Sequence, residues 1–115
     1  MFQKNLNALK QTNAKLAEKL AKITIDEAKK DIEVFEAESK DVIIAYKKNP
    51  LDSIYDPIRE AKTIWHKTIR EELKKNDIQI VFGLGLGYLF KRAYAGAESR
   101  IVVFEPITEV IRFVL

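Results

Sequence analysis

The sequence predicts an α/β fold in which a helical and β-hairpin amino-terminal part precedes an incomplete parallel βαβ unit. Three observations lead to this prediction. Apolar residues recur at helical spacing near the start, two short runs rich in β-branched residues follow, and glycines separate two further apolar runs near the end. We expect the boundary at Asn76–Asp77, giving an amino-terminal domain of residues 1–76 and a second domain that begins at residue 77 and runs to 115.

Composition limits the classes of protein to consider. Hydrophobic residues make up 47% of the 115 positions and charged residues 32%, which is typical of a globular domain with a modest core. The 20 basic and 17 acidic side chains are mixed along the chain, which argues against nucleic acid as the main partner. Cysteine is absent, so disulfides, thiolate metal sites and cysteine nucleophiles are excluded. Without a signal peptide or a run long enough to span a membrane, the sequence predicts a cytoplasmic protein.

The first helix is predicted from a heptad-like stripe between Phe2 and Ile23, with Asn13 filling one gap. The apolar members of the stripe are Phe2, Leu6, Leu9, Leu16, Leu20 and Ile23. This spacing suits a helix that packs on its own domain, and a short coiled coil is the alternative.

Two strands are predicted next, at Ile32–Glu38 and Val42–Tyr46. Both segments are short and rich in β-branched or aromatic residues, and Ser39–Asp41 would join them as a hairpin. A helix is the alternative for the first of them. Alternation places three residues of the second strand on one face: Val42, Ile44 and Tyr46.

A loop over Asn49–Pro57 and a second long helix follow. Asp56 has the character of an N-cap and Pro57 that of a first helical residue, where a missing N–H costs nothing. The helix is expected to run to about Lys75. Its apolar face would consist of Ile58, Ala61, Ile64, Trp65, Ile69 and Leu73.

The last segment has the order strand, glycine turn, helix, strand, acid. Ile78–Phe82 and Arg100–Phe104 are nearly continuous apolar runs, typical of parallel strands buried on both faces. A helix over Tyr88–Tyr94 would connect them and end near Gly96. This is the order of a Rossmann-like nucleotide-binding unit with a right-handed crossover.

The glycine spacing has a physical explanation. Gly83 permits a sharp exit from the strand, Gly85 removes a side chain where a ligand must approach, and Gly87 allows close contact at the helix start. Free N–H groups near Tyr88 would suit a phosphate or carboxylate. Glu105 follows Gly83 by 22 residues, close to the ~20 expected for an acid that accepts hydrogen bonds from ribose hydroxyls.

The loop departs from the commonest cofactor motifs. The dinucleotide pattern would need glycine where Tyr88 stands, a P-loop would need a Gly-Lys-Ser/Thr sequence, and the usual methyltransferase motif would have an acid in place of Val81. A tight strand-to-helix turn that binds no ligand is therefore an alternative. The single histidine, His66, does not predict a metal site, because no carboxylate partners can be identified for it. The acidic residues between Asp26 and Glu38 are irregularly spaced, which favours a solvated face, and no catalytic residue is identified.

Three stretches resemble one known family. SIYDPIREAKTIW, VFGLGLGYLFKRAYAG and RIVVFEP are similar to segments of the bacterial motility accessory factors. These proteins are flagellin glycosyltransferases, and their central domain is also related to an archaeal pterin pyrophosphokinase. The specific part of the resemblance begins at Tyr55, and Ile107 departs from it because a polar residue often follows the Glu-Pro pair in the family.

The resemblance implies a cytoplasmic enzyme that transfers a nonulosonic acid, such as pseudaminic or legionaminic acid, from CMP to serine or threonine of flagellin. It implies that Gly83, Gly85, Gly87 and Glu105 belong to the nucleotide-sugar site. Family members are several times longer, so it also implies an amino-terminal piece. The alternatives are another Rossmann-like enzyme, such as a methyltransferase or a pterin pyrophosphokinase, and an interaction module that binds flagellin or a second copy.

Two expectations concern the behaviour of this chain. Gly85→Val should abolish CMP-sugar binding and leave the fold largely intact, because the branched side chain would occupy the ligand's place. The chain alone should be inactive and should self-associate, because two parallel strands would keep an open edge and uncovered faces. The residues expected to lack partners are Ile101, Val103, Phe104, Val110, Ile111, Phe113 and Val114.

Overall fold

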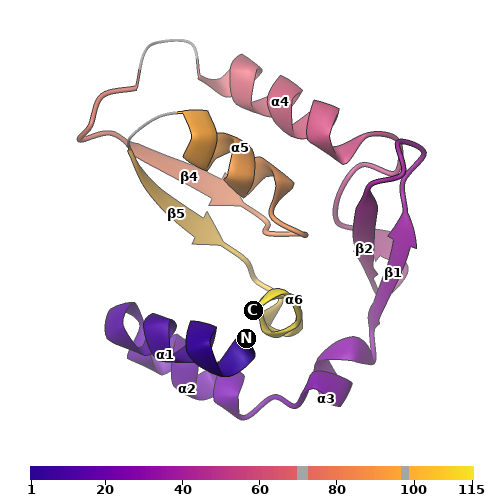
Figure 1. Ribbon diagram of the computed structural model, residues 1–115, viewed down its shortest axis with the longest axis vertical. Helices are drawn as coiled ribbons and strands as arrows, with labels where there is room; N and C mark the ends of the chain where they lie inside the picture. The colour runs from indigo at the N-terminus through magenta and orange to yellow at the C-terminus, as the bar shows by residue number, and fades with distance from the viewer. Residues whose placement is uncertain (70–72, 97–98) are drawn as a thin grey trace.

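The computed structural model describes residues 1–69, 73–96 and 99–115, and it confirms the predicted α/β fold class. The structure contains an antiparallel three-stranded sheet, which lies at one side of the molecule, and a parallel two-stranded sheet (Figure 1). In chain order the elements are α1 (Phe2–Thr12), α2 (Ala14–Ala21), α3 (Ile25–Lys29), β1 (Ile32–Glu36), β2 (Val42–Tyr46), β3 (Asn49–Pro50), α4 (Pro57–Thr68), β4 (Ile78–Phe82), α5 (Tyr88–Gly96), β5 (Arg100–Phe104) and α6 (Thr108–Val114).

The amino-terminal stripe lies on two helices, so the prediction of one continuous helix is wrong. Asn13 ends α1 and caps α2, where its side-chain oxygen accepts a hydrogen bond from the Leu16 N–H at 3.1 Å. Asparagine favours such caps because its short side chain competes for backbone hydrogen bonds. The stripe still forms a core, in which Leu6 and Leu20 are buried and Ile111 of α6 packs against them. This packing matches a helix pair on its own domain rather than a coiled coil.

The hairpin is confirmed, and it gains a third strand. β1 pairs antiparallel with β2 in a register that places Val34 opposite Ile44, although β1 ends at Glu36 instead of Glu38. β3 pairs with the end of β2, so the prediction that Asn49–Pro50 belongs to a loop is wrong. Lys47 and Lys48 both adopt positive φ, at 48° and 66°, which allows the tight two-residue turn between β2 and β3.

The centre of β2 is buried. Ile43, Ile44 and Ala45 are all buried, whereas Val42 is exposed. Consecutive strand residues point to opposite sides, so both faces of the centre of β2 are covered. Ile44 packs with Ile32 and with Val110 of α6.

Helix α4 begins as predicted and ends earlier. The Asp56 carboxylate accepts a hydrogen bond from the Arg59 N–H at 2.8 Å, and Pro57 is the first helical residue. The helix ends at Thr68, where two β-branched residues in succession weaken it and Ile69 turns to extended geometry. Leu73 and Lys74 are not helical, so the predicted extension to Lys75 is wrong; residues 70–72 lie outside the described residues.

The Asp56 cap has a measurable consequence. Asp56→Ala should lower the free energy of unfolding by about 1 kcal/mol, because the first turn of α4 would lose its side-chain acceptor. Urea denaturation measures this difference. Asp56→Asn is the matched control, since asparagine caps equally well and should leave stability nearly unchanged. Equal losses in the two variants would contradict the capping role.

Strands β4 and β5 are parallel, as predicted, in a register that runs from Ile78 opposite Arg100 to Phe82 opposite Phe104. Figure 1 shows α4 and α5 on one side of this sheet. On that side the buried Gln79 side chain connects β4 to α4 and α5. Its amide oxygen accepts a hydrogen bond from the Trp65 indole N–H at 2.9 Å, and its amide nitrogen donates to the Ala93 carbonyl at 3.1 Å.

The other side of β4 and β5 is uncovered in the part of the chain that the structure describes, which agrees with the expectation that this chain leaves the two parallel strands with an uncovered face. We call this side the bare face. Its residues are exposed and apolar: Ile78, Ile80, Phe82, Val102 and Phe104. The crossover helix covers one face of the sheet, and nothing among the described elements covers the second.

Helix α6 does not lack partners, which corrects another expectation. Val110 of α6 is fully buried against Ile32 and Ile44 of the hairpin, and Ile111, Phe113 and Val114 pack into the two hydrophobic clusters. The Arg112 side chain donates through Nε to the Ile23 carbonyl at 2.9 Å and lies over the Phe2 ring. Contacts of this kind connect the predicted domains and bring the two ends of the chain side by side (Figure 1).

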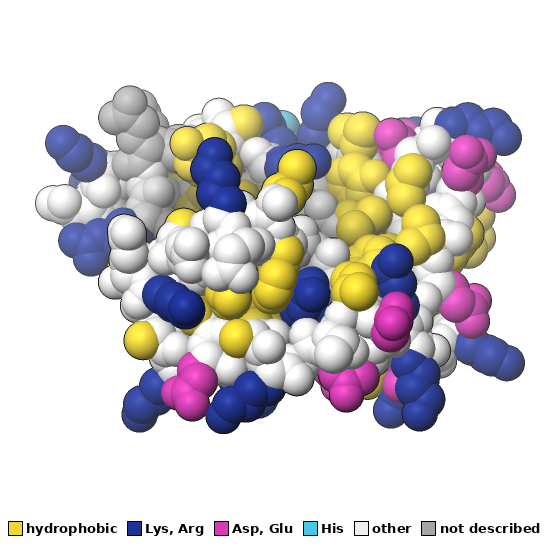
Figure 2. Space-filling view, turned by 60° about the horizontal axis from the view of Figure 1, so that its bottom comes forward, with side chains coloured by type: hydrophobic (Ala, Val, Ile, Leu, Met, Phe, Trp, Pro, Cys, Tyr) yellow, Lys and Arg dark blue, Asp and Glu magenta, His cyan; other side chains and the backbone are white. Residues whose placement is uncertain are grey.

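The surface is mixed in character. Figure 2 shows Lys and Arg side chains interspersed with Asp and Glu around hydrophobic patches. Within residues 1–69, 73–96 and 99–115, no helix combines the length and hydropathy needed to cross a membrane.

Candidate functional site

The glycine loop joins β4 to α5 in a conformation that its three glycines make accessible. Gly83, Gly85 and Gly87 all have positive φ, at 81°, 49° and 85°. Residues with a Cβ rarely adopt this region, so the alternating glycines follow from the path of the backbone. The Gly83 N–H donates to the Phe104 carbonyl at 2.8 Å, which fastens the loop to the end of β5.

Glu105 lies at the carboxyl end of β5 and organises the loop. One carboxylate oxygen accepts a hydrogen bond from the Leu84 N–H at 2.7 Å, and the other accepts from the Ile107 N–H at 2.9 Å. The sequence predicted that this acid binds a ribose hydroxyl. What the structure shows is that its carboxylate holds the loop and the start of α6. Each carboxylate oxygen can accept a second hydrogen bond, so a ligand hydroxyl could still bind there.

Asp52 is a site residue that sequence reasoning missed. Its Oδ2 atom accepts a hydrogen bond from the Leu86 N–H at 3.1 Å, just before α5 begins. The carboxylate lies directly on Gly85, where an added Cβ would be 2.5 Å from Oδ1. Burial is the main cause that raises the pKa of Asp52, and repulsion from Glu60 adds to it, while the Leu86 hydrogen bond acts in the opposite direction.

This contact changes the interpretation of Gly85. The sequence predicted that a side chain at this position would enter ligand space, whereas the Cβ direction of Gly85 meets Asp52. At Gly83 and Gly87 an added Cβ would meet no described atom within 4 Å. Substitution of Gly85 should therefore disturb the loop itself, in contrast to the expectation that the fold would remain largely intact.

Tyr88 holds the start of α5 against the hairpin. Its phenolic O–H donates to the Val42 carbonyl at 2.6 Å. Burial raises the pKa of Tyr88, and the carboxylates of Asp41 and Asp52 add to this effect. The sequence placed Tyr88 in the site through its backbone N–H, and the structure gives its side chain a role in packing.

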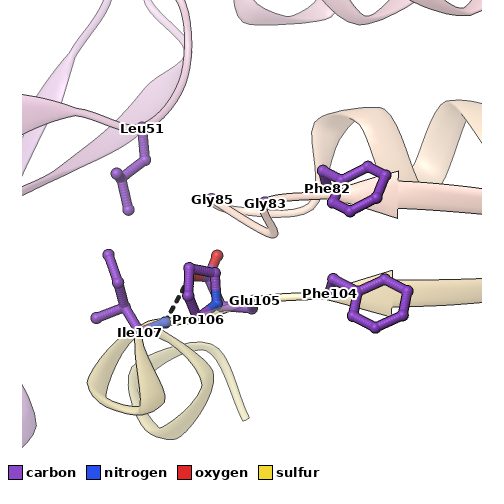
Figure 3. A pocket seen from close by; sticks show the side chains of 8 residues that line it. All are labelled: Leu51, Phe82, Gly83, Gly85, Phe104, Glu105, Pro106 and Ile107. Atoms are coloured by element: carbon purple, nitrogen blue, oxygen red, sulfur yellow. Dashed lines mark hydrogen bonds between the residues drawn. The ribbon is translucent and has the colours of Figure 1, made fainter.

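A cavity of about 580 Å³ opens at the carboxyl ends of β4 and β5 (Figure 3). Of the predicted site residues, it brings together Gly83, Gly85 and Glu105. The remaining wall consists of apolar side chains: Leu51, Phe82, Phe104, Pro106 and Ile107. A smaller cavity of about 140 Å³ is lined by Tyr88, together with Asp52, Glu60 and part of the glycine loop. Gly87 lines neither of these two cavities as the structure describes them.

The larger cavity lies where open α/β sheets ordinarily bind ligands. In open α/β sheets, ligands bind outside the carboxyl ends of the strands, next to the loops that follow them. The fold and this cavity define a Rossmann-like βαβ unit with a glycine loop and an acid at the end of the second strand. Comparisons with protein-family models, with curated proteins and with solved structures find no match.

The raised pKa of Asp52 predicts a pH dependence of stability. Because the folded state favours the protonated carboxyl, its contribution to stability is fully present below the ordinary pKa of aspartate and is lost as the pH rises through the folded pKa. We expect stability relative to Asp52→Asn to fall as the pH rises from about 4. Urea denaturation across this range measures the difference. A difference that stays constant with pH, or that grows in favour of Asp52, would contradict the assignment.

Proposed function

We propose that this chain forms the nucleotide-sugar-binding site of a cytoplasmic glycosyltransferase similar to the bacterial motility accessory factors. The reaction would transfer a nonulosonic acid from its CMP carrier to serine or threonine of flagellin. This modification would be needed for flagellar assembly and motility. The chain would be the amino-terminal portion of the enzyme, would supply this binding site and would be inactive alone.

One observation carries this proposal. The two motifs with the most specific resemblance, FGLGLGY and VFEP, are separated by 14 residues in the sequence, and residues of both line one cavity. Gly83 and Gly85 come from the first motif, and Glu105 and Pro106 from the second. The cavity lies where a Rossmann-like unit binds its ligand.

Calorimetric titration of the 115-residue chain tests the proposal. CMP and a CMP-nonulosonic acid should bind saturably, and S-adenosylmethionine and ATP should not. Binding of S-adenosylmethionine alone would indicate a methyltransferase, and binding of ATP alone would favour a pterin pyrophosphokinase. Failure of both cytidine compounds to bind would overturn the proposal.

The bare face supports a second function, self-association. Its five residues are uncharged and their side chains are exposed along both strands. A parallel sheet is ordinarily covered on both faces, and among residues 1–69, 73–96 and 99–115 no further strand pairs with the outer edge of β4 or β5. A second copy of the chain presents the same apolar surface, so two copies could cover each other's bare face; flagellin is the alternative occupant.

A further inference from the structure

The glycine loop has already used most of its backbone donors within the chain. The Leu84 N–H donates to Glu105 and the Leu86 N–H donates to Asp52. The Gly83 and Gly87 N–H groups donate to backbone carbonyls. A phosphate cradle needs several free N–H groups that converge on one point, and this loop does not present them.

The charges near the loop also disfavour a phosphate in the larger cavity. Among the lining residues that the structure describes, Glu105 carries the single charge, which is negative. Asp52 adds a second carboxylate at the Leu86 N–H. A phosphate placed between these carboxylates would meet repulsion without a lysine or arginine in the wall to offset it.

The wall of the cavity suits a flat, uncharged ring instead. Phe82 and Phe104 lie side by side at the strand ends, with ring centroids 5.5 Å apart and ring planes 17° apart. They are 77% and 52% exposed, so their rings are accessible. Figure 3 shows Leu51 and Ile107 across the cavity from these rings, with the glycine loop and Glu105 between.

We infer that this cavity binds the planar base of a nucleotide, and that the phosphates remain outside it. The base would stack on the Phe82 and Phe104 rings, as bases do on aromatic side chains in other proteins. The carboxylate of Glu105 retains acceptor capacity for an amino hydrogen of the base or a ribose hydroxyl. This inference rests on the proposed function, since it assigns one part of the nucleotide-sugar to one part of that site.

Titration of the 115-residue chain with cytidine, CMP and inorganic phosphate tests the inference. Cytidine should bind within about threefold of CMP, because the base contributes most of the contact. Inorganic phosphate should not compete with CMP. Binding of CMP without binding of cytidine, together with competition by inorganic phosphate, would overturn the inference. The proposed function would still stand in that case. If neither CMP nor cytidine binds, both are overturned.

Two variants locate the binding. Phe104→Leu and Phe82→Leu should each weaken cytidine and CMP about tenfold by removing a stacking surface. Tyr94→Leu is the matched control, because Tyr94 is 74% exposed on α5 and does not line the cavity. Circular dichroism checks that each variant is folded, and titrations at two protein concentrations separate ligand binding from self-association. Equal affinity for cytidine and CMP in all three variants would contradict binding of the base in this cavity.

Discussion

Gly85→Ala is expected to lower the free energy of unfolding by about 2–4 kcal/mol. Positive φ at a residue with a Cβ costs about 1–2 kcal/mol, and the added methyl carbon would also displace the Asp52 carboxylate that lies 2.5 Å from its position. The hydrogen bond from the Leu86 N–H to Asp52 would then be lost or distorted. Urea denaturation at neutral pH measures the loss.

Two controls isolate the contact with Asp52. Gly83→Ala has a similar backbone strain and open space at its Cβ, so it should cost only about 1–2 kcal/mol. In a double-mutant cycle, the cost of Gly85→Ala should fall toward that of Gly83→Ala when Asp52 is replaced by alanine. If Gly85→Ala lowers the free energy of unfolding no more than Gly83→Ala does when Asp52 is present, the contact between the added Cβ and the Asp52 carboxylate does not destabilise the loop.

The bare face should determine the oligomeric state. We expect the molar mass from light scattering to rise with protein concentration, because a second copy would bury large apolar side chains that each contribute about 1.5–3 kcal/mol when fully buried. Ile80→Lys should keep the chain monomeric by placing a charge at the centre of the bare face.

Val34→Lys is the matched control for Ile80→Lys. Both residues are 56% exposed, and Val34 lies on β1, away from the bare face. The control variant should associate like the unmodified chain. A chain that remains monomeric at high concentration without either substitution would show that the bare face does not bind a second copy.

The features that the sequence predicted correctly depend on local signals. The apolar runs of β4 and β5, the hairpin and the Asp56 cap are each specified by a few neighbouring residues. The glycine spacing and the position of Glu105 also predicted which loop would face the end of β5. These features were therefore accessible without knowledge of the tertiary packing.

The features that the sequence did not predict depend on residues far apart in the chain. Asp52 precedes the Leu86 N–H that it binds by 34 residues, and no spacing rule connects them. Val110 is buried against Ile32 and Ile44, which a pattern within α6 cannot reveal. The sequence predicted that the two strands would keep uncovered faces, but only the structure shows which face is bare and that Phe82 and Phe104 line a cavity there.

A nitrogen–proton correlation spectrum recorded during a CMP titration tests most directly the proposal that a nucleotide binds at the glycine loop. The chain has four glycines, whose amide signals fall in a characteristic region. Gly83 and Gly85 line the cavity, whereas Gly96 lies at the other end of α5 against Trp65 and serves as an internal reference. We predict saturable shifts at Gly83 and Gly85 with little change at Gly96. Shifts that are absent from all four glycines, or that are largest at Gly96, would contradict the proposal.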